Sequence, residues 1–205
     1  MGNGVSRIAK VLACVLLVGC ASEAPAQRGE PSQTRYSNPE YAYAVQLPPG
    51  IGIMTSTPPI PDQGFGVRLA PPVNLWLYAD YETGTISSLA EKAEDVRESF
   101  QGSGCRTVER TMTTLGGAPA AELTFQCPPH SNGEPPETVK QRLTLRTLPG
   151  RAPIVYRVGL QYPQGSQAGA EAERLYQALI DGFSFTAPEA GRPPSRRGGR
   201  ANFPS

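Results

Sequence analysis

The stretch CRTVERTMTTLGGAPAAELTFQC (residues 105–127) contains two runs typical of β-strands, separated by the pair Gly116-Gly117. Adjacent glycines between such runs are typical of a two-residue hairpin turn, whose central residues need positive φ. Positions equally distant from the turn then face each other. The sequence therefore predicts an antiparallel hairpin that places apolar side chains opposite apolar side chains. The facing pairs include Val108 with Phe125 and Met112 with Ala121.

Outside the hairpin, alternating apolar residues predict further strands, and a period of 3.6 residues predicts two helices. The first helix begins at a capping box, Ser88 with Glu91, and ends at Gly102. The second ends at Gly182, which we expect at the C′ position. The order indicates an α+β fold in one domain, residues 36–186. The other predicted strands cover residues 41–47, 64–70, 73–81, 138–148, 153–162 and 183–185.

Residues 1–19 have the pattern of a secretory signal peptide. Arg7 and Lys10 precede an apolar run over residues 11–19, and that run is too short to span a bilayer as a helix. We therefore expect an exported protein. The sequence after the signal predicts a flexible stalk over residues 20–35, and residues 187–205 are predicted to be a disordered, locally basic tail.

Two cleavage sites compete in the N-terminal segment. Leu17-Val18-Gly19-Cys20 abuts the apolar run and resembles the lipobox of bacterial lipoproteins, whose cysteine becomes the lipidated N-terminus. Ala24-Pro25-Ala26 is an A-x-A site, and cleavage after Ala26 would release a soluble periplasmic or secreted protein. We expect lipidation of Cys20, with palmitate-type chains as the membrane anchor. By resemblance to Gram-negative lipoproteins, Ala21 favours the periplasmic face of the outer membrane.

The remaining cysteines form an even pair. Cys14 leaves with the signal peptide and Cys20 is the lipidation site, so Cys105 and Cys127 remain. In an oxidising compartment a disulfide between them is expected, and two buried thiols are the alternative. The two-residue turn sets Cys105 opposite Pro128, so a direct disulfide needs a bulge or a three-residue turn.

Three segments carry a family resemblance. They are YSNPEYAYAVQLPPG (36–50), TLGGAPAAELTF (114–125), and IVYRVGLQYP followed by a helix and IDGFSF (154–185). Together they resemble the PsbP/Mog1-like family, including bacterial lipoproteins of that fold. The resemblance implies an antiparallel sheet with helices packed on it, an α/β/α sandwich, in proteins that mostly act as binding or assembly partners. Ile51 stands where many relatives carry Trp. No residue here matches the residues with which family members bind metal or GTPases, so the resemblance assigns no partner to this protein.

No catalytic or metal-binding constellation stands out. His130 is the only histidine and lies in a proline-rich loop, whereas a catalytic triad or a zinc site needs further ligands around it. We therefore predict no enzymatic activity, no metal and no cofactor. The alternative is an exported envelope hydrolase that uses Asp80 and Glu82, after the strand containing Trp76, as an acid and base pair. These carboxylates are more simply explained as turn residues that complement the dipole of the following helix.

Cations alternate along the predicted strand 138–148. If this strand pairs with the next, four cations share one face, which is a candidate surface for binding an anion such as a lipid headgroup, a cell-wall polymer or an acidic partner. A solvated polar face is the alternative. The four cations are Lys140, Arg142, Arg146 and Arg157.

The formal net charge of +1 offers no argument for nucleic acid. The export signal, the stalk and the compact domain instead predict a lipid-anchored module of the bacterial envelope. We expect it to face the periplasm and to bind, or help assemble, an envelope protein or cell-wall partner.

Overall fold

The computed structural model describes residues 34–55, 63–129 and 133–188, which all belong to one compact unit. The predicted signal peptide, the lipidation site Cys20, the loop histidine His130 and the basic tail lie outside these residues. Those assignments stay predictions.

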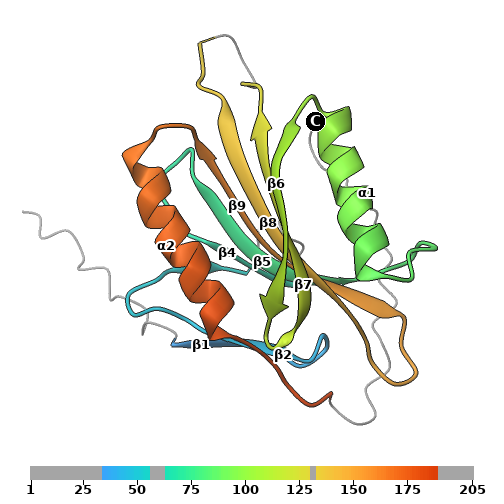
Figure 1. Ribbon diagram of the computed structural model, residues 1–205. Coiled ribbons are helices and arrows are strands. Elements are labelled where there is room, and N and C mark those ends of the chain that lie inside the picture. The colour runs from blue at the N-terminus through green and yellow to red at the C-terminus, as the bar shows by residue number, and fades with distance from the viewer. Residues whose placement is uncertain (1–33, 56–62, 130–132, 189–205) are drawn as a thin grey trace, which may run out of the picture. The chain divides into compact units, whose positions relative to one another are not determined.

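A seven-stranded antiparallel sheet forms the centre of the domain, in the order β3-β4-β5-β9-β8-β7-β6, and a three-stranded sheet has the order β1-β2-β10 (Figure 1). The large sheet contains β3 (Ile53–Met54), β4 (Gly64–Val67), β5 (Asn74–Tyr81), β6 (Arg106–Leu115), β7 (Ala118–Cys127), β8 (Glu137–Thr147) and β9 (Pro153–Pro163). The small sheet contains β1 (Arg35–Asn38), β2 (Tyr43–Gln46) and β10 (Phe183–Phe185). The helices are α1 (Leu89–Gly102) and α2 (Gln167–Gly182).

The two helices cover opposite faces of the large sheet (Figure 1). α1 packs on β6, β7 and β8, whereas α2 packs on β9 and on β2 of the small sheet. Alternate residues of β7 show the division, because successive side chains of a strand point to opposite faces. Leu123 and Phe125 lie in the hydrophobic cluster beneath α1, and Ala120 lies in the cluster beneath α2. We call these the α1 face and the α2 face. The predicted α+β architecture is confirmed.

The larger hydrophobic cluster joins the two sheets through aromatic side chains. The Tyr43 ring stacks on Phe183 at 5.6 Å and meets the Tyr156 ring edge-on at 5.9 Å. The Tyr156 hydroxyl donates to the carbonyl of Tyr41 at 2.7 Å, so this buried hydroxyl is satisfied. Burial raises the pKa of Tyr156 to about 12. The small sheet is therefore held in place by ring packing and by side-chain bonds to the backbone.

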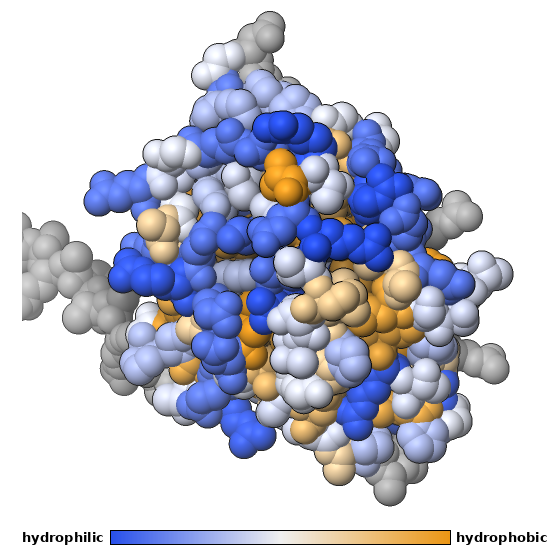
Figure 2. Space-filling model, viewed as in Figure 1, coloured by the Kyte–Doolittle hydropathy of each residue, from blue (hydrophilic) through white to orange (hydrophobic). Residues whose placement is uncertain are grey.

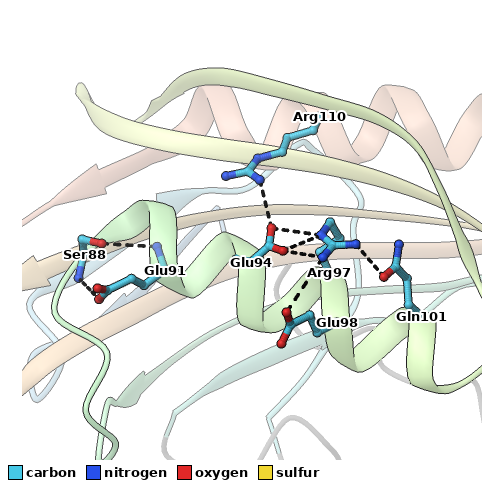
Figure 3. Close-up of polar contacts among 7 residues, drawn as sticks. All are labelled: Ser88, Glu91, Glu94, Arg97, Glu98, Gln101 and Arg110. Atoms are coloured by element: carbon cyan, nitrogen blue, oxygen red, sulfur yellow. Dashed lines mark hydrogen bonds and ion pairs between the residues drawn. The ribbon is translucent and has the colours of Figure 1, made fainter.

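The helix ends agree with the sequence at α1 and differ at α2. The Ser88 side chain accepts a hydrogen bond from the backbone of Glu91, and the Glu91 carboxylate accepts one from the backbone of Ser88, which forms the predicted capping box (Figure 3). Gly182 was expected at C′, but it is the last residue of α2. A Cβ atom at Gly182 would lie 2.3 Å from the carbonyl oxygen of Gln46. Close packing of α2 against β2 therefore explains this glycine.

The hairpin has the predicted two-residue turn together with a bulge. Met112 pairs with Ala121 as expected, whereas the register shifts between Thr107 and Glu109. The predicted pairing of Val108 with Phe125 is wrong, because Thr107 takes that position and Val108 is the extra residue of the bulge.

Two apolar side chains of β6 are exposed, although Met112 lies opposite the apolar Ala121 as predicted. This strand forms an edge of the sheet, and Val108 and Met112 are 44% and 65% exposed. The bulge changes the register by one residue towards the open end of the hairpin. Cys105 thereby comes level with Cys127, and the two are joined by a disulfide.

Replacing both cysteines, Cys105→Ala with Cys127→Ala, is expected to lower the free energy of unfolding by about 3 kcal/mol, because the disulfide closes a loop with a sequence separation of 22. Urea unfolding of the oxidised protein and the double variant measures the difference. Met112→Ala, exposed on the same hairpin, is the control and should change stability by no more than about 0.5 kcal/mol. Equal migration of the natural chain on reducing and non-reducing gels would contradict the disulfide.

Candidate functional site

The four cations predicted to share one face do not do so. In the register of β8 with β9, Leu143 pairs with Arg157, and directly paired residues of an antiparallel sheet point to the same face. Arg157 therefore points to the α1 face together with Leu143. Lys140, Arg142 and Arg146 occupy the alternate positions and point to the α2 face. Odd-numbered residues of β8 pair with odd-numbered residues of β9, so the odd-numbered Arg157 cannot share a face with the even-numbered cations of β8. The predicted four-cation surface is therefore wrong.

The three cations on the α2 face are engaged by neighbouring groups. Arg142 binds Glu122 on β7, with its Nη2 2.6 Å from Oε2. Lys140 binds Glu173 of α2 at 3.0 Å. The Arg146 guanidinium lies 4.5 Å from the centroid of the Phe185 ring, a cation–π contact. These side chains are half-buried and attach α2 and β10 to the sheet, so they do not form an open cationic surface.

A tyrosine hydroxyl completes the polar contacts beneath α2. The Tyr176 hydroxyl donates to Glu122 at 3.2 Å. Burial, with the nearby Glu122 carboxylate adding to it, raises the pKa of Tyr176 well above its usual range. The Tyr162 hydroxyl also donates to Glu173. Most polar groups on this face therefore have partners within the protein, and Arg146 Nη1 is a buried atom without one.

Charged side chains on the outer surface of α1 are also paired (Figure 3). Arg97 binds Glu94, and Arg110 of β6 reaches the same carboxylate at 3.2 Å. The hydrogen bond from Arg97 holds the pKa of Glu94 below its usual range. Figure 2 shows hydrophilic side chains interspersed with small hydrophobic areas on the face it displays. This network ties α1 to the edge strand, and it offers no group suited to chemistry.

The part of the α1 face that α1 does not cover has a different character. Here Trp76 of β5 pairs with Gly159 of β9, and Tyr78 pairs with Arg157. Asp80 lies on the same face because it follows Tyr78 by two residues in β5. Helix α1 packs on β6, β7 and β8. These residues of β5 and β9 therefore lie next to the area that the helix covers. We call Trp76, Tyr78, Asp80, Arg157 and Gly159 the tryptophan face.

The aromatic rings of the tryptophan face lie against the sheet. A Cβ atom at Gly159 would lie 2.3 Å from Cε2 of Trp76, so the indole occupies the space that any other residue would fill. A Cβ at Gly64, which pairs with Tyr78, would lie 2.0 Å from the carbonyl oxygen of Leu77, so this glycine allows close approach of β4 to β5. The Arg157 guanidinium is 5.9 Å from the centroid of the Tyr78 ring. Gly159 therefore allows the Trp76 ring to pack closely on this face.

Neither ring of the tryptophan face belongs to a hydrophobic cluster of the described residues. Within the same residues, Trp76 Nε1 and the Tyr78 hydroxyl make no hydrogen bond, and Arg157 has its ring contact and a charge interaction with Asp80. By contrast, each of the other tyrosine hydroxyls has a polar partner. Three partly exposed side chains whose polar groups make no hydrogen bond within the described residues thus lie together on this face.

The two carboxylates considered for catalysis lie in different surroundings. Asp80 is inside β5, not after it, and accepts a hydrogen bond from Gln63 at 2.9 Å. Burial raises the pKa of Asp80, against the lowering influence of Arg157 and Gln63. Glu82 binds Lys92 of α1 at 2.8 Å and accepts from the backbone of Gly84. Asp80 therefore belongs to the tryptophan face, whereas Glu82 serves to fix α1.

Sequence reasoning missed the grouping of Trp76, Tyr78 and Arg157. The signal was present in VNLWLYADY (73–81), where Leu75, Leu77 and Ala79 alternate with Trp76, Tyr78 and Asp80. The first set is buried beneath α2, so the second set must occupy the opposite face. Arg157 joins them only through the pairing of β5 with β9, which no local pattern reveals.

The described part of the chain contains no group of three or more His, Cys, Asp or Glu side chains placed to hold a metal ion. Among the same residues, no helix is both long enough and apolar enough to cross a membrane.

No family model and no curated protein matches the sequence. Solved structures do match. LpqN of Mycobacterium tuberculosis, which is involved in cell envelope biogenesis, has a TM-score of 0.55 and 16% identity over 78% of this chain and 88% of that chain. The cyanobacterial PsbP (CyanoP) of Synechocystis sp. PCC 6803 has a TM-score of 0.50 and 12% identity over 79% of this chain and 97% of that chain.

The domain has the PsbP/Mog1-like fold. The Ran-binding protein Mog1p of Saccharomyces cerevisiae also matches, with a TM-score of 0.49 and 13% identity over 74% of this chain and 94% of that chain. The likeness to CyanoP confirms the fold that the sequence resemblance implied. At these identities the likeness shows the PsbP/Mog1-like fold alone, and it assigns no partner.

Asp80→Asn is expected to stabilise the protein at pH 7 while preserving the acceptor for Gln63. Because the folded-state pKa of Asp80 is raised, the folded state binds this proton more tightly than the unfolded state. The stabilisation by this proton is complete below the unfolded pKa of about 3.9 and is lost as pH rises through the folded pKa. The unfolding temperature of the variant should thus exceed that of the natural protein at pH 7, with a smaller difference at pH 4. A difference independent of pH would contradict this assignment.

Proposed function

We propose that this protein is a lipid-anchored module of the bacterial cell envelope that faces the periplasm and binds, or helps assemble, another envelope component. The observation that supports the proposal most directly is the disulfide between Cys105 and Cys127, because such bonds persist in oxidising compartments. The lipobox-like Leu17-Val18-Gly19-Cys20 adds an export signal and an anchor in the same chain. Together they favour the periplasmic side of a membrane.

The fold adds support of a coarser kind. LpqN, which has a similar fold, is involved in cell envelope biogenesis, and an envelope role for this chain agrees with its export signal. Ala21 after the proposed lipidated cysteine favours the outer membrane. The partner is an envelope protein or a cell-wall component, and the near-neutral charge offers no basis for nucleic-acid binding.

Binding without catalysis is the function that the side chains favour. The tryptophan face offers rings and polar groups that the protein leaves unsatisfied, which suits recognition. The hydrolase alternative needs Asp80 and Glu82 to act as a pair. Glu82 is instead committed to an ion pair with Lys92, whose side chain is only 9% exposed. Lys92 also binds Asp95 at 2.8 Å, so Glu82 is part of an ion-pair cluster that fixes α1, which favours a structural role for Glu82.

The anchor is tested by Cys20→Ser. The variant cannot be lipidated and should move from the membrane fraction to the soluble periplasm, as cell fractionation and immunoblotting would show. Cys14→Ser is the matched control, because it removes a thiol from the same segment and should leave the protein in the membrane. An unchanged distribution of Cys20→Ser would contradict lipidation. A mature mass that begins at Gln27 would instead support cleavage after Ala26.

The binding role is tested by crosslinking in intact cells, followed by purification of the full-length protein under denaturing conditions. A stoichiometric envelope protein or cell-wall fragment should be recovered with the natural protein and reduced with Trp76→Ala. Met112→Ala, on the distant edge strand, is the control and should retain the partner. Recovery of no crosslinked component, or an envelope hydrolase activity lost in Asp80→Asn, would contradict a module that only binds.

A further inference from the structure

We propose that the tryptophan face is a glycan-binding site and that its ligand is a chain of pyranose sugars from the cell envelope. That the glycan comes from the cell envelope rests on the proposed function. That the ligand is a sugar is inferred from the side chains of the tryptophan face. A pyranose ring has an apolar face of C–H groups and an edge of hydroxyls. A site for it therefore needs a flat aromatic surface with planar polar groups around it.

Trp76 and Tyr78 supply the flat surface. They are two residues apart on one strand, so they lie about 7 Å from each other on the same face. Gly159 lets the indole lie against the backbone of β9, because no Cβ atom separates them. A ring held in this way loses little conformational freedom on binding, and preorganisation increases affinity.

The polar groups around the rings match the hydroxyl edge of a sugar. Trp76 Nε1 and the Arg157 guanidinium are donors, the Tyr78 hydroxyl is both donor and acceptor, and the second carboxylate oxygen of Asp80 is an acceptor. Within the protein, the Asp80 carboxylate accepts hydrogen bonds from Gln63 and from the backbone of Tyr81, and the side chain remains exposed. Hydroxyls both donate and accept, so a sugar can use this mixed set, whereas an anion would be repelled by Asp80.

A buried acceptor in the same cross-strand row also lacks a partner. Gln141 pairs with Gly159, which in turn pairs with Trp76. The Gln141 residue is only 6% exposed, and its Oε1 has no hydrogen bond. Buried polar atoms are rarely left without a partner in a structural core. Gln141 therefore adds an acceptor without a protein partner beneath this row, as Thr107 Oγ1 and Arg146 Nη1 add unpartnered polar atoms elsewhere in the described residues.

A protein partner is favoured less at this surface. Interfaces between proteins are centred on desolvated apolar anchors, and the large hydrophobic side chains that are exposed in the described residues, Val108 and Met112, lie on β6. Three strands, β7, β8 and β9, separate β6 from β5 in the sheet order, although Met112 points to the same face as Tyr78. A proline-rich peptide, which can also stack on aromatic rings, is an outcome that the experiment must distinguish.

The test uses the full-length lipidated protein in a detergent without a sugar headgroup. The probes are a soluble hexamer of β-1,4-linked N-acetylglucosamine, maltohexaose and purified peptidoglycan sacculi. Because Trp76 is the only tryptophan, its fluorescence reports directly on the proposed site. A saturable change in emission with at least one hexamer, or co-sedimentation with sacculi, is the expected result. Binding to none of the three probes would overturn the proposal.

Three variants test the residues, with binding measured by calorimetry and sedimentation. Trp76→Ala should weaken binding about tenfold or more. Tyr78→Phe removes a hydroxyl that has no partner in the described residues, and should weaken binding about two- to tenfold without altering thermal stability. Gly159→Ala keeps the indole but displaces it, so it should weaken binding as Trp76→Ala does. Met112→Ala is the control and should bind as the natural protein does.

Equal affinity of the natural protein, Tyr78→Phe and Gly159→Ala would overturn the site assignment even if a glycan binds. Binding of a proline-rich peptide in place of every glycan would overturn the ligand class. Failure here remains distinct from failure of the proposed function, because Cys20→Ser and crosslinking test the anchor and the partner independently. Shortening of a hexamer that is lost in Asp80→Asn would keep the site but contradict a function without catalysis.

Discussion

The alternation of side chains across the central antiparallel sheet is the constraint on which the rest of the structure depends. Each residue of β8 and β9 points to one helix or the other, and the register of the pair decides which. A shift of one residue would place Lys140 and Arg142 beneath α1, among its apolar side chains, and would remove their carboxylate partners. The burial cost of unpaired charges therefore fixes the register and the identity of both faces.

The bulge at Val108 shows how one extra residue reconciles two requirements. The Gly116-Gly117 turn sets the pairs near it, such as Met112 with Ala121, and the disulfide sets the position of Cys105 against Cys127. These two registers differ by one residue. The bulge absorbs the difference on an edge strand, where an irregular backbone also discourages pairing with other chains.

Local patterns predicted the elements well, because capping, turns and alternation act over a few residues. The capping box at Ser88, the end of α1 and the two-residue hairpin turn were all predictable in this way. The face of Arg157 was not, since it depends on the register between two strands and thus on the geometry of the β8–β9 turn. The tryptophan face was missed for the same reason. Its members come from two strands that are far apart in the sequence but paired in the sheet.

Gly159 affects both the stability of the sheet and the position of Trp76 in the proposed binding site. A glycine inside a strand weakens it, because the residue contributes no side chain and loses much backbone freedom on folding. Here Gly159 lies in the middle of β9, between β5 and β8. On the tryptophan face, the absence of a side chain at Gly159 lets the Trp76 indole pack directly against β9. The glycine therefore improves the packing of this ring, which compensates for part of its cost to the strand. The ring stays partly exposed, so the same packing holds its outer surface in place for the proposed ligand.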